Sequence, residues 1–358
     1  PYWLAGGNPW ENHPWRDRPH AALPSHADVV VIGAGFTGGS LAYHWAKYGP
    51  VRSTPSMVVL DMGDVASGSS GRNEGLVVMG RYCHMVAGTV KKSLESVRTD
   101  LRPDQREKLA RQFAVAYCQA AYRNGDLVEQ TIRHEQFDCD YARQGWVQAR
   151  DADQQSSLAE SVRLAQDTGT TDWTSITPEE VLQRTGMQAS HNAGFSIAAA
   201  SFHPAKWVFS LFRVAIASGR VELYSRTRVT RVERLHGNGQ AHYRIHTSRG
   251  TIDCDDVVNA TEAYTPMLHP QFHDRILPTQ TQAASGTGGP ATIAPHVGIS
   301  GTRAFFARHQ DAILIGSDAT RVPDKEAGVM QPSRFITAFA LGELQRYYGP
   351  SATRITHE

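Results

Sequence analysis

The clearest hydrophobic pattern follows a proline- and tryptophan-rich N-terminal segment. Residues 28–32 form a short β-branched run, a glycine-rich stretch comes next, and residues 39–48 have the pattern of a helix that ends at Gly49. A second apolar run, residues 57–60, is closed by Asp61. The order of strand, glycine turn, helix and strand predicts a βαβ unit with two parallel strands and a right-handed crossover.

The rest of the chain contains both helical and strand patterns. Helices are predicted over residues 103–135, where apolar residues recur at three- and four-residue steps from Leu109 to Ala120, over 204–218 and over about 333–348. Residues 285–289 are expected to form a loop because they are rich in glycine. Alternating apolar and polar positions predict strands over residues 221–224, 227–232, 243–247, 251–258, 304–308 and 312–316.

Residues 1–27 lack a periodic apolar pattern and contain five prolines together with Trp3, Trp10 and Trp15. This segment is expected to run as an extended arm whose aromatic side chains pack on a domain. The first residue is proline, so the sequence is expected to be a trimmed or partial chain.

Composition narrows the class of protein. The 358 residues are 41% hydrophobic, which is enough for two packed domains, and 36 Lys+Arg against 35 Asp+Glu leave a net charge of +1. This balance argues against nucleic-acid binding and against disorder, and favours a small-molecule function. No apolar stretch reaches the roughly 18 residues that a membrane span requires, and no secretory signal pattern is present.

Cysteine and histidine usage excludes two further kinds of site. Cys83, Cys118, Cys139 and Cys254 stand far apart, which favours reduced, mostly buried thiols and a cytoplasmic location over a disulfide framework or a zinc site. Among the 16 histidines no pair has the H-E-x-x-H or H-x-x-x-H context of a metal site on a helix, so no metal site is expected.

The first candidate binding motif is the glycine-rich turn. Gly33, Gly35 and Gly38 form a G-x-G-x-x-G pattern between a strand and a helix, where a diphosphate can bind the helix N-terminus. Asp61 follows Gly38 by 23 residues, so its carboxylate can accept hydrogen bonds from ribose hydroxyls and disfavours a 2′-phosphate. The alternative is a glycine-rich turn that binds nothing.

Residues 66–75 indicate that the cofactor is a flavin and not a nicotinamide dinucleotide. Their sequence, Ala-Ser-Gly-Ser-Ser-Gly-Arg-Asn-Glu-Gly, resembles the S-G-R-N-x-G signature of the D-amino-acid oxidase and glycine oxidase family of flavoproteins, and most closely its gamma-glutamylputrescine oxidase branch. Residues 201–204, 227–232, 250–258 and 260–265 follow the same family's order, so the resemblance covers roughly residues 28–320.

The resemblance implies an α/β fold with a Rossmann-like FAD-binding domain of the glutathione-reductase type and a discontinuous α+β substrate domain. The FAD domain is expected to comprise residues 28–90, 190–265 and 312–358, and the substrate domain residues 91–189 and 266–311. It also implies a further strand and a glycine- and proline-bearing turn that faces the flavin, a segment this sequence does not include.

Carried over position by position, the resemblance places Ser70, Arg72, Asn73 and Gly75 along the FAD diphosphate, ribityl chain and ring edge. Val229 is expected to bond the adenine through its backbone. A surface ion pair is the alternative for Arg72. The full expected cofactor set is Gly33, Gly35, Phe36, Thr37, Gly38, Asp61, Met62, Ser69, Ser70, Arg72, Asn73, Gly75, Val229, Ala260 and Thr261.

The signature loop holds no residue that could bind FAD covalently. Cys83 and His84 follow it, but buried or surface roles are the simpler expectation for both, so non-covalent FAD is predicted. The loop departs from the branch at Glu74, which replaces a usual glycine, and Glu262 replaces a usual asparagine.

The expected substrate site centres on Arg308, which matches the arginine that holds the substrate carboxylate in glycine oxidase. A guanidinium can bind a carboxylate through two hydrogen bonds, although an arginine at a strand end is also commonly solvated. Tyr264 could line the pocket or be part of the core.

The implied reaction is oxidation of a C–N bond in an amine or amino acid, by hydride transfer to flavin N5, imine hydrolysis and reoxidation by O₂. No dedicated catalytic base is assigned. The alternatives are a flavin dehydrogenase that uses another electron acceptor and a non-catalytic FAD-binding subunit of a larger assembly. The amine and the oligomeric state are not determined by the sequence.

Overall fold

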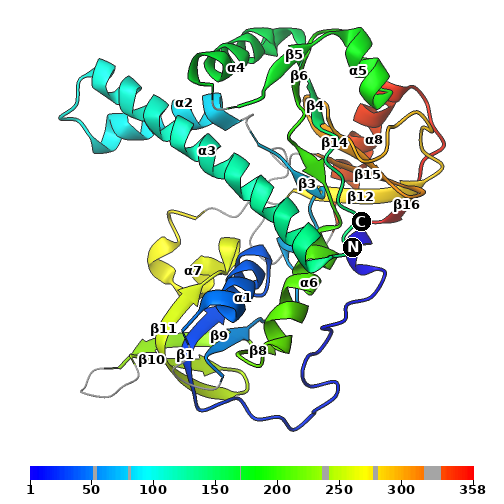
Figure 1. Ribbon diagram of the computed structural model, residues 1–358. Helices are drawn as coiled ribbons and strands as arrows, with labels where there is room; N and C mark the ends of the chain where they lie inside the picture. Colours follow the sequence, from blue (N-terminus) through cyan, green and yellow to red (C-terminus); the bar gives the residue numbers. More distant parts are fainter. Residues whose placement is uncertain (51–54, 80–81, 170, 236–241, 277–280, 318–331) are drawn as a thin grey trace. The chain divides into compact units, whose positions relative to one another are not determined.

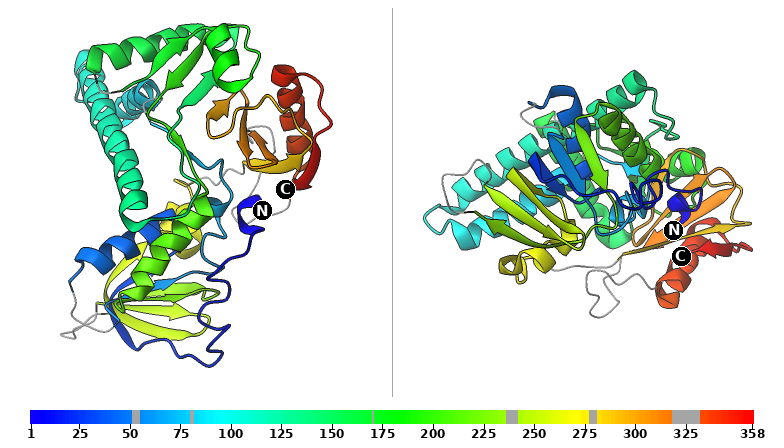
Figure 2. Two further views of the ribbon diagram at one scale, coloured as in Figure 1. Left: turned by 45° about the vertical axis from the view of Figure 1, so that its right-hand side comes forward. Right: turned by 90° about the horizontal axis from the view of Figure 1, so that it is seen from below.

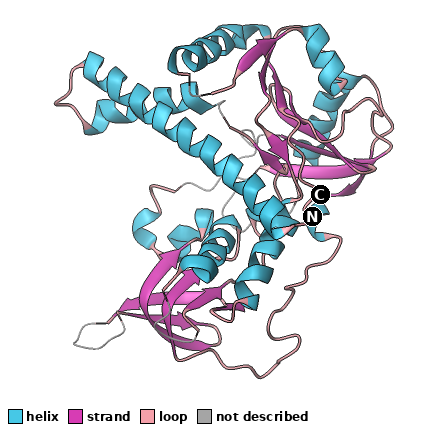
Figure 3. Cartoon of the chain, viewed as in Figure 1, coloured by secondary structure: helices cyan, strands magenta, loops and turns pink. Residues whose placement is uncertain are grey.

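The computed structural model describes the backbone of residues 1–50, 55–79, 82–169, 171–235, 242–276, 281–317 and 332–358, without the side chains of residues 82–85. The chain divides into two compact units. Among the described residues, the first unit contains 1–73 and 203–276, and the second contains 74–202, 281–317 and 332–358. Figure 3 distinguishes the helices from the strands of each unit.

The first unit is built on a six-stranded sheet of β1 (His26–Ile32), β2 (Met57–Leu60), β8 (Val221–Tyr224), β9 (Val229–Arg234), β10 (Tyr243–Thr247) and β11 (Gly250–Asn259). The strand order is β8-β2-β1-β11-β10-β9 (Figure 1). The first four strands in this order are parallel, and β10 and β9 are antiparallel additions. The predicted parallel pair of β1 and β2 is therefore confirmed.

The register of the parallel strands brings three chain segments together. Ile32 at the end of β1 pairs with Leu60 of β2 and with Asn259 of β11. Parallel strands end at the same edge of a sheet. Gly33, Asp61 and Ala260, which directly follow β1, β2 and β11, therefore lie side by side at this edge. Every residue of β1 from Ala27 to Ile32 is buried, which explains the uninterrupted apolar run of this strand.

Helices α1 (Phe36–Tyr48) and α6 (Pro204–Ala217) pack against each other in the first unit. A Cβ atom at Gly39 of α1 would lie 3.4 Å from side-chain atoms of Phe212 and Val208 of α6, an ordinary contact distance, so the two helices are closely packed at this point. The other helical segments are short: Tyr2–Leu4, Ser69–Gly71, Glu262–Tyr264, α7 (Thr265–Leu268) and Pro270–Phe272. One apolar core of this unit contains Trp15, Ala27, Val30, Ile32, Val58, Leu60, Tyr224, Ile245, Ile252 and Cys254.

The second unit is built on an eight-stranded mixed sheet with the order β16-β12-β15-β14-β13-β4-β6-β5. Its strands are β4 (Trp146–Ala149), β5 (Thr174–Ile176), β6 (Ala193–Ser196), β12 (Gln282–Thr287), β13 (Gly298–Ser300), β14 (Ala304–His309), β15 (Ala312–Ser317) and β16 (Arg354–His357). A separate antiparallel pair joins β3 (Leu76–Val77) to β7 (Ala200–Ser201).

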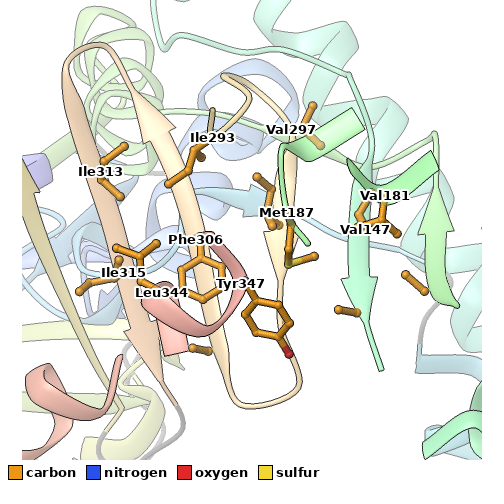
Figure 4. Close-up of a cluster of buried hydrophobic side chains, with 14 of the residues drawn as sticks. Val147, Val181, Met187, Ile293, Val297, Phe306, Ile313, Ile315, Leu344 and Tyr347 are labelled. Atoms are coloured by element: carbon orange, nitrogen blue, oxygen red, sulfur yellow. The ribbon is translucent and has the colours of Figure 1, made fainter. Parts of the chain in front are cut away.

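The helices of the second unit are α2 (Tyr82–Val97), α3 (Pro103–Glu135), the 3-10 turn Ala152–Gln154, α4 (Gln155–Thr168), α5 (Pro178–Thr185) and α8 (Arg334–Tyr348). Figure 2 shows that α2 runs beside α3. Leu344 and Tyr347 of α8 lie in the same buried cluster as Phe306 of β14 and Ile315 of β15 (Figure 4). Burial of side chains of this size contributes about 1.5–3 kcal/mol each.

Most predicted elements are confirmed, with small shifts at their ends. The first helix begins at Phe36, three residues before the predicted start, because the glycine turn leads directly into it. The prediction of a loop at residues 285–289 is wrong, because Ser285–Thr287 belong to strand β12, which pairs with β15 and β16. A side chain at Gly286 would lie 2.7 Å from the Arg354 carbonyl oxygen, so here glycine allows close strand packing and does not form a loop.

The apolar face of α3 also differs from the predicted one. Leu109, Phe113 and Tyr117 are 40%, 54% and 46% exposed, whereas Ala114 and Cys118 are buried against α2 and α4. Small residues allow neighbouring helices to approach closely, so they form the buried face despite their lower hydrophobicity.

The two units divide the chain differently from the expected domains. Residues 312–317 and 332–358 belong to the second unit, because β15 pairs with β12 and β14 and α8 packs on these strands. Residues 74–79 and 190–202 also lie in the second unit, and residues 266–276 lie in the first.

Candidate cofactor site

The turn after β1 requires glycine at two positions for purely steric reasons. Gly33 has φ +115°, and a Cβ atom there would lie 2.4 Å from the Ala260 carbonyl oxygen. A Cβ atom at Gly38 would lie 1.9 Å from the carbonyl oxygen of Gly33. The turn is therefore compact enough to direct the N-terminus of α1 toward the edge where the parallel strands end.

The first turn of α1 presents free backbone donors. Among the described residues, the amides of Thr37 and Gly38 donate to no protein acceptor, while the Phe36 amide donates to Ser70 Oγ at 2.9 Å. Free amides and the positive end of a helix dipole together favour an anion such as a diphosphate. A Cβ atom at Gly35 would lie 2.6 Å from Ser70 Oγ, so this glycine also lets the loop that carries Ser70 approach the helix.

Asp61 closes β2 beside this turn. Its carboxylate accepts the Ala34 amide at 2.6 Å and the Gly63 amide at 2.7 Å, and its carbonyl oxygen accepts the amide of Thr227. Burial raises the pKa of Asp61 above its ordinary value, the two backbone amides oppose this, and the nearby Asp64 charge raises it further. Asp61 is thus an oriented acceptor next to the glycine turn, as ribose binding requires.

The signature loop is held largely by its own atoms. Arg72 Nε donates to the Ser67 carbonyl oxygen at 2.7 Å, and Asn73 Nδ2 donates to the carbonyl oxygens of Ser69 and Ser70 at 3.1 and 2.9 Å. Burial lowers the pKa of the Arg72 guanidinium, an effect that Tyr264 partly opposes. In the described part of the chain no carboxylate pairs with Arg72, so the ion-pair alternative is not observed.

Several other predicted residues lie in the same unit. The Ala260 amide donates to the Ile32 carbonyl oxygen at 2.8 Å, which places the turn after β11 against the glycine turn. Thr261 Oγ1 donates to Asn259 Oδ1 at 2.8 Å. Val229 is half-buried at the start of β9, where it pairs with Thr247. Met62 and Ser69 are exposed, and Tyr264 is half-buried.

The remaining predicted residues belong to the second unit. Gly75 has φ +73°, and its carbonyl oxygen accepts the amide of Phe202 at 2.8 Å. Arg308 is half-buried, and its Nε and Nη2 atoms donate to the carbonyl oxygens of Ile293 at 3.0 Å and Pro290 at 2.7 Å. Arg308 is therefore not a simply solvated arginine: two of its donors hold the segment between β12 and β13.

The predictions of no covalent tether and no metal site concern cysteine, histidine and acidic side chains. The side chains of Cys83 and His84 lie outside the described residues. Cys118, Cys139 and Cys254 are buried, as predicted. Within the described ranges, no group of three or more His, Cys, Asp or Glu side chains is arranged to bind a metal, and no described helix has the length and apolar character of a membrane span.

Two contacts in and beside the signature loop could not be predicted from the sequence. The Ser70 hydroxyl accepts the first amide of α1, and Asp64 binds Arg226 through its carboxylate, with Nη2 to Oδ2 at 2.8 Å. These contacts join residues 34 and 162 positions apart, so no local pattern reveals them.

Together, a glycine turn, a helix N-terminus with free amides and a carboxylate at the end of the next parallel strand define a dinucleotide-binding α/β domain. Arg72, which pairs with no carboxylate among the described residues, and the amides of Thr37 and Gly38 fit an anionic diphosphate. The family model described as FAD dependent oxidoreductase matches residues 28–358, and the chain belongs to this family.

The chain resembles several characterised proteins of this kind. It is 25% identical over 263 residues to gamma-glutamylputrescine oxidoreductase of Escherichia coli (strain K12), an alignment that covers 71% of this chain and 54% of that protein. The chain thus spans about half the length of this relative.

Two solved structures share the fold. L-amino acid deaminase from Proteus vulgaris, with its specific insertion deleted, has a TM-score of 0.64 and 20% identity, covering 94% of this chain and 78% of that one. L-proline dehydrogenase from P.horikoshii has a TM-score of 0.65 and 15% identity, covering 91% and 78%.

Proposed function

We propose that the protein takes part in FAD-dependent oxidation of a C–N bond in an amine or amino acid. The observation that carries this proposal is the meeting of the glycine turn, the free α1 amides and Asp61 at one sheet edge, in a chain of the FAD dependent oxidoreductase family. The proteins that this chain resembles, an oxidoreductase of gamma-glutamylputrescine, a deaminase of L-amino acids and a dehydrogenase of L-proline, support a nitrogen-bearing substrate.

In this proposal the first unit binds FAD without a covalent link. The α1 amides and Arg72 hold the diphosphate, Asp61 accepts the ribose hydroxyls, and the backbone at Val229 contacts the adenine. Thr227, two residues before Val229, donates its amide to the Asp61 carbonyl oxygen at 2.7 Å, which supports a common adenosine end for these groups.

The second unit supplies substrate recognition in this proposal. Arg308 donates two of its hydrogen bonds to backbone carbonyls, and a guanidinium has five donors, so Nη1 retains donors for a substrate carboxylate. A carboxylate held there would orient an amino acid by charge and geometry together.

FAD held by the α1 amides, Arg72 and Asp61 would supply a hydride acceptor, N5, for the carbon of the substrate C–N bond, so that a neutral amine would be converted to an iminium ion. Water would hydrolyse this ion to a carbonyl compound and an amine or ammonia, and O₂, the proposed final electron acceptor, would take the two electrons and be reduced to hydrogen peroxide. An amine that binds in its neutral form needs no general base. The protein then contributes orientation of the reacting C–H bond and exclusion of water.

The proposal is tested by anaerobic flavin reduction. The full chain is loaded with FAD and mixed with primary amines, secondary amines and amino acids, while flavin absorbance is followed. Bleaching by one class supports the proposal and identifies that class. Bleaching that O₂ does not reverse but a quinone does would identify a dehydrogenase. Flavin that binds and is bleached by none of these compounds would favour a non-catalytic FAD-binding subunit.

A further inference from the structure

The N-terminal strap, defined as residues 2–16, crosses the outside of the signature loop in the first unit. In Figure 2 it is the dark-blue segment that leads toward β1. Trp3 is only 5% exposed, and its Nε1 donates to the Asn73 carbonyl oxygen at 2.8 Å. Asn8 Nδ2 donates to the Val65 carbonyl oxygen at 2.9 Å. The strap therefore binds the backbone at both ends of loop 65–73.

The opposite side of the same loop contacts the glycine turn. The Ala66 amide donates to the Ala34 carbonyl oxygen at 3.1 Å, and Ser70 Oγ accepts the Phe36 amide. Leu4 of the strap lies where a side chain at Gly71 would approach within 3.2 Å. The loop is thus held between the strap and the N-terminus of α1, the part of the site with free backbone donors.

The strap is itself anchored independently of the loop. Trp15 is 6% exposed, its Nε1 donates to the Ser225 carbonyl oxygen at 2.7 Å, and the Arg249 guanidinium lies 3.9 Å from its ring centre. Trp10 Nε1 donates to the Phe209 carbonyl oxygen of α6 at 3.2 Å. These contacts fix the strap to the sheet and to α6, so it can restrain the loop.

The strap also reaches the carboxylate end of the site. The Asn12 amide donates to Asp64 Oδ1 at 2.7 Å, and Asp64 is paired with Arg226. The Arg226 amide donates to the Gly63 carbonyl oxygen at 2.8 Å, and Gly63 is the residue whose amide Asp61 accepts. The strap thus touches both segments that face the dinucleotide site.

We propose that the N-terminal strap holds loop 65–73 in its FAD-binding conformation before the cofactor arrives, with Trp3 and Asn8 as positioning residues. The proposal rests on the FAD site proposed above. A loop that is already ordered pays no ordering entropy on binding, so the strap increases FAD affinity without touching the cofactor.

The test compares the full-chain wild type with the double variant Trp3→Phe/Asn8→Ala and with Trp10→Phe. Trp10→Phe is the matched control, because it also removes one indole donor from the strap, but that donor binds α6 and not the loop. Two readouts are used: amide hydrogen exchange of peptides covering residues 63–75 without added flavin, and the FAD dissociation constant from flavin fluorescence.

The double variant is expected to exchange loop amides faster and to bind FAD about 30-fold more weakly, because two hydrogen bonds to the loop backbone are lost and this fold-change corresponds to about 2 kcal/mol. Trp10→Phe should leave both quantities near the wild-type values, because Trp15 still anchors the strap and Trp3 and Asn8 still bind the loop. Unchanged loop exchange in the double variant, or equal losses in Trp10→Phe, would overturn the proposal. If the double variant does not fold, Asn8→Ala alone is compared in the same way. The exchange readout does not require FAD, so failure of wild-type FAD binding would count against the cofactor site and not against the strap.

Discussion

Asp61 Oδ2 lies 2.6 Å from the Ala34 amide nitrogen and accepts its hydrogen bond, which ties the end of β2 to the glycine turn after β1. The other carboxylate oxygen accepts the Gly63 amide. Each carboxylate oxygen can accept more than one hydrogen bond, so Asp61 retains acceptor capacity for ribose hydroxyls. The two backbone amides also fix the direction in which this capacity points.

The first prediction is that FAD affinity falls at mildly acidic pH. Ribose hydroxyls donate to the charged form of Asp61, so affinity is lost as pH falls through the pKa of this carboxyl group. Burial raises that pKa above its ordinary value, and the loss should therefore begin at a higher pH than for an exposed aspartate. The FAD dissociation constant measured between pH 4 and 8 checks this; a flat profile would contradict it.

Two variants distinguish the contribution of Asp61 from that of Asp64. Asp61→Asn should weaken FAD binding about 10- to 100-fold at pH 7 and abolish this pH dependence, because a charged hydrogen-bond acceptor is lost. Asp64→Asn removes the neighbouring charge that raises the Asp61 pKa, so it should move the loss of affinity to lower pH.

The second prediction concerns Gly35. Replacement by alanine or valine places a Cβ atom 2.6 Å from Ser70 Oγ, so this hydroxyl must turn away from the Phe36 amide. Valine also places a bulky side chain where the diphosphate must approach the turn, so its flavin content should collapse. Gly68→Ala is the matched control, because a Cβ atom there meets nothing within 4 Å. Flavin content is read from the absorbance of the purified proteins. A Gly35→Val protein with full flavin content would show that the binding mode is wrong.

The third prediction is that FAD is released on denaturation. The loop of residues 67–75 contains no residue able to form a covalent flavin link. Acid precipitation should therefore leave a colourless pellet and a yellow supernatant. A yellow pellet would contradict the prediction and direct peptide mapping to Cys83 and His84.

The fourth prediction decides between amino-acid and simple amine substrates. Arg308→Ala should reduce the apparent affinity for an amino acid by about 2 kcal/mol or more, because a buried carboxylate loses its partner. The decarboxylated amine should not show this selective loss. Since Arg308 also holds the carbonyl oxygens of Pro290 and Ile293, any general loosening should affect both substrates equally.

Anaerobic flavin reduction by the paired substrates measures this difference. Arg303→Ala is the control, because Arg303 is an exposed arginine next to the same strand. Equal effects on the amino acid and the amine would show that Arg308 has only the structural role. A selective change of only a few-fold is the size of an exposed ion pair and would not support the carboxylate role.

The fifth prediction concerns backbone strain at Glu262, which has φ +48°. Asparagine adopts this left-handed conformation more readily than glutamate, so Glu262→Asn should raise the free energy of unfolding by up to about 1 kcal/mol. Glu262→Gln is the control that removes the charge without relieving the backbone. Urea unfolding of the three proteins checks the order; equal stability of the asparagine and glutamine variants would contradict it.

The sequence by itself determined the dinucleotide-binding motif. The apolar runs of β1 and β2, the three glycines and Asp61 all lie within about 35 residues, and their order dictates a parallel pair with a glycine turn between strand and helix. The steric demand at Gly38 is likewise local, because a Cβ atom there would meet the carbonyl oxygen of Gly33, whereas the clash at Gly33 is with Ala260 and depends on the tertiary structure.

Only the tertiary structure decided which distant segments of the chain pair and pack within each unit. Ser285–Thr287 form a strand because β15 and β16 flank them, although their glycine content favours a loop. Residues 312–317 and α8 belong to the second unit because of pairing and packing across the chain. Trp3 binds Asn73 across 70 positions. Such contacts depend on shape and burial between remote segments, and local patterns of hydrophobic and polar residues do not encode which partners will meet.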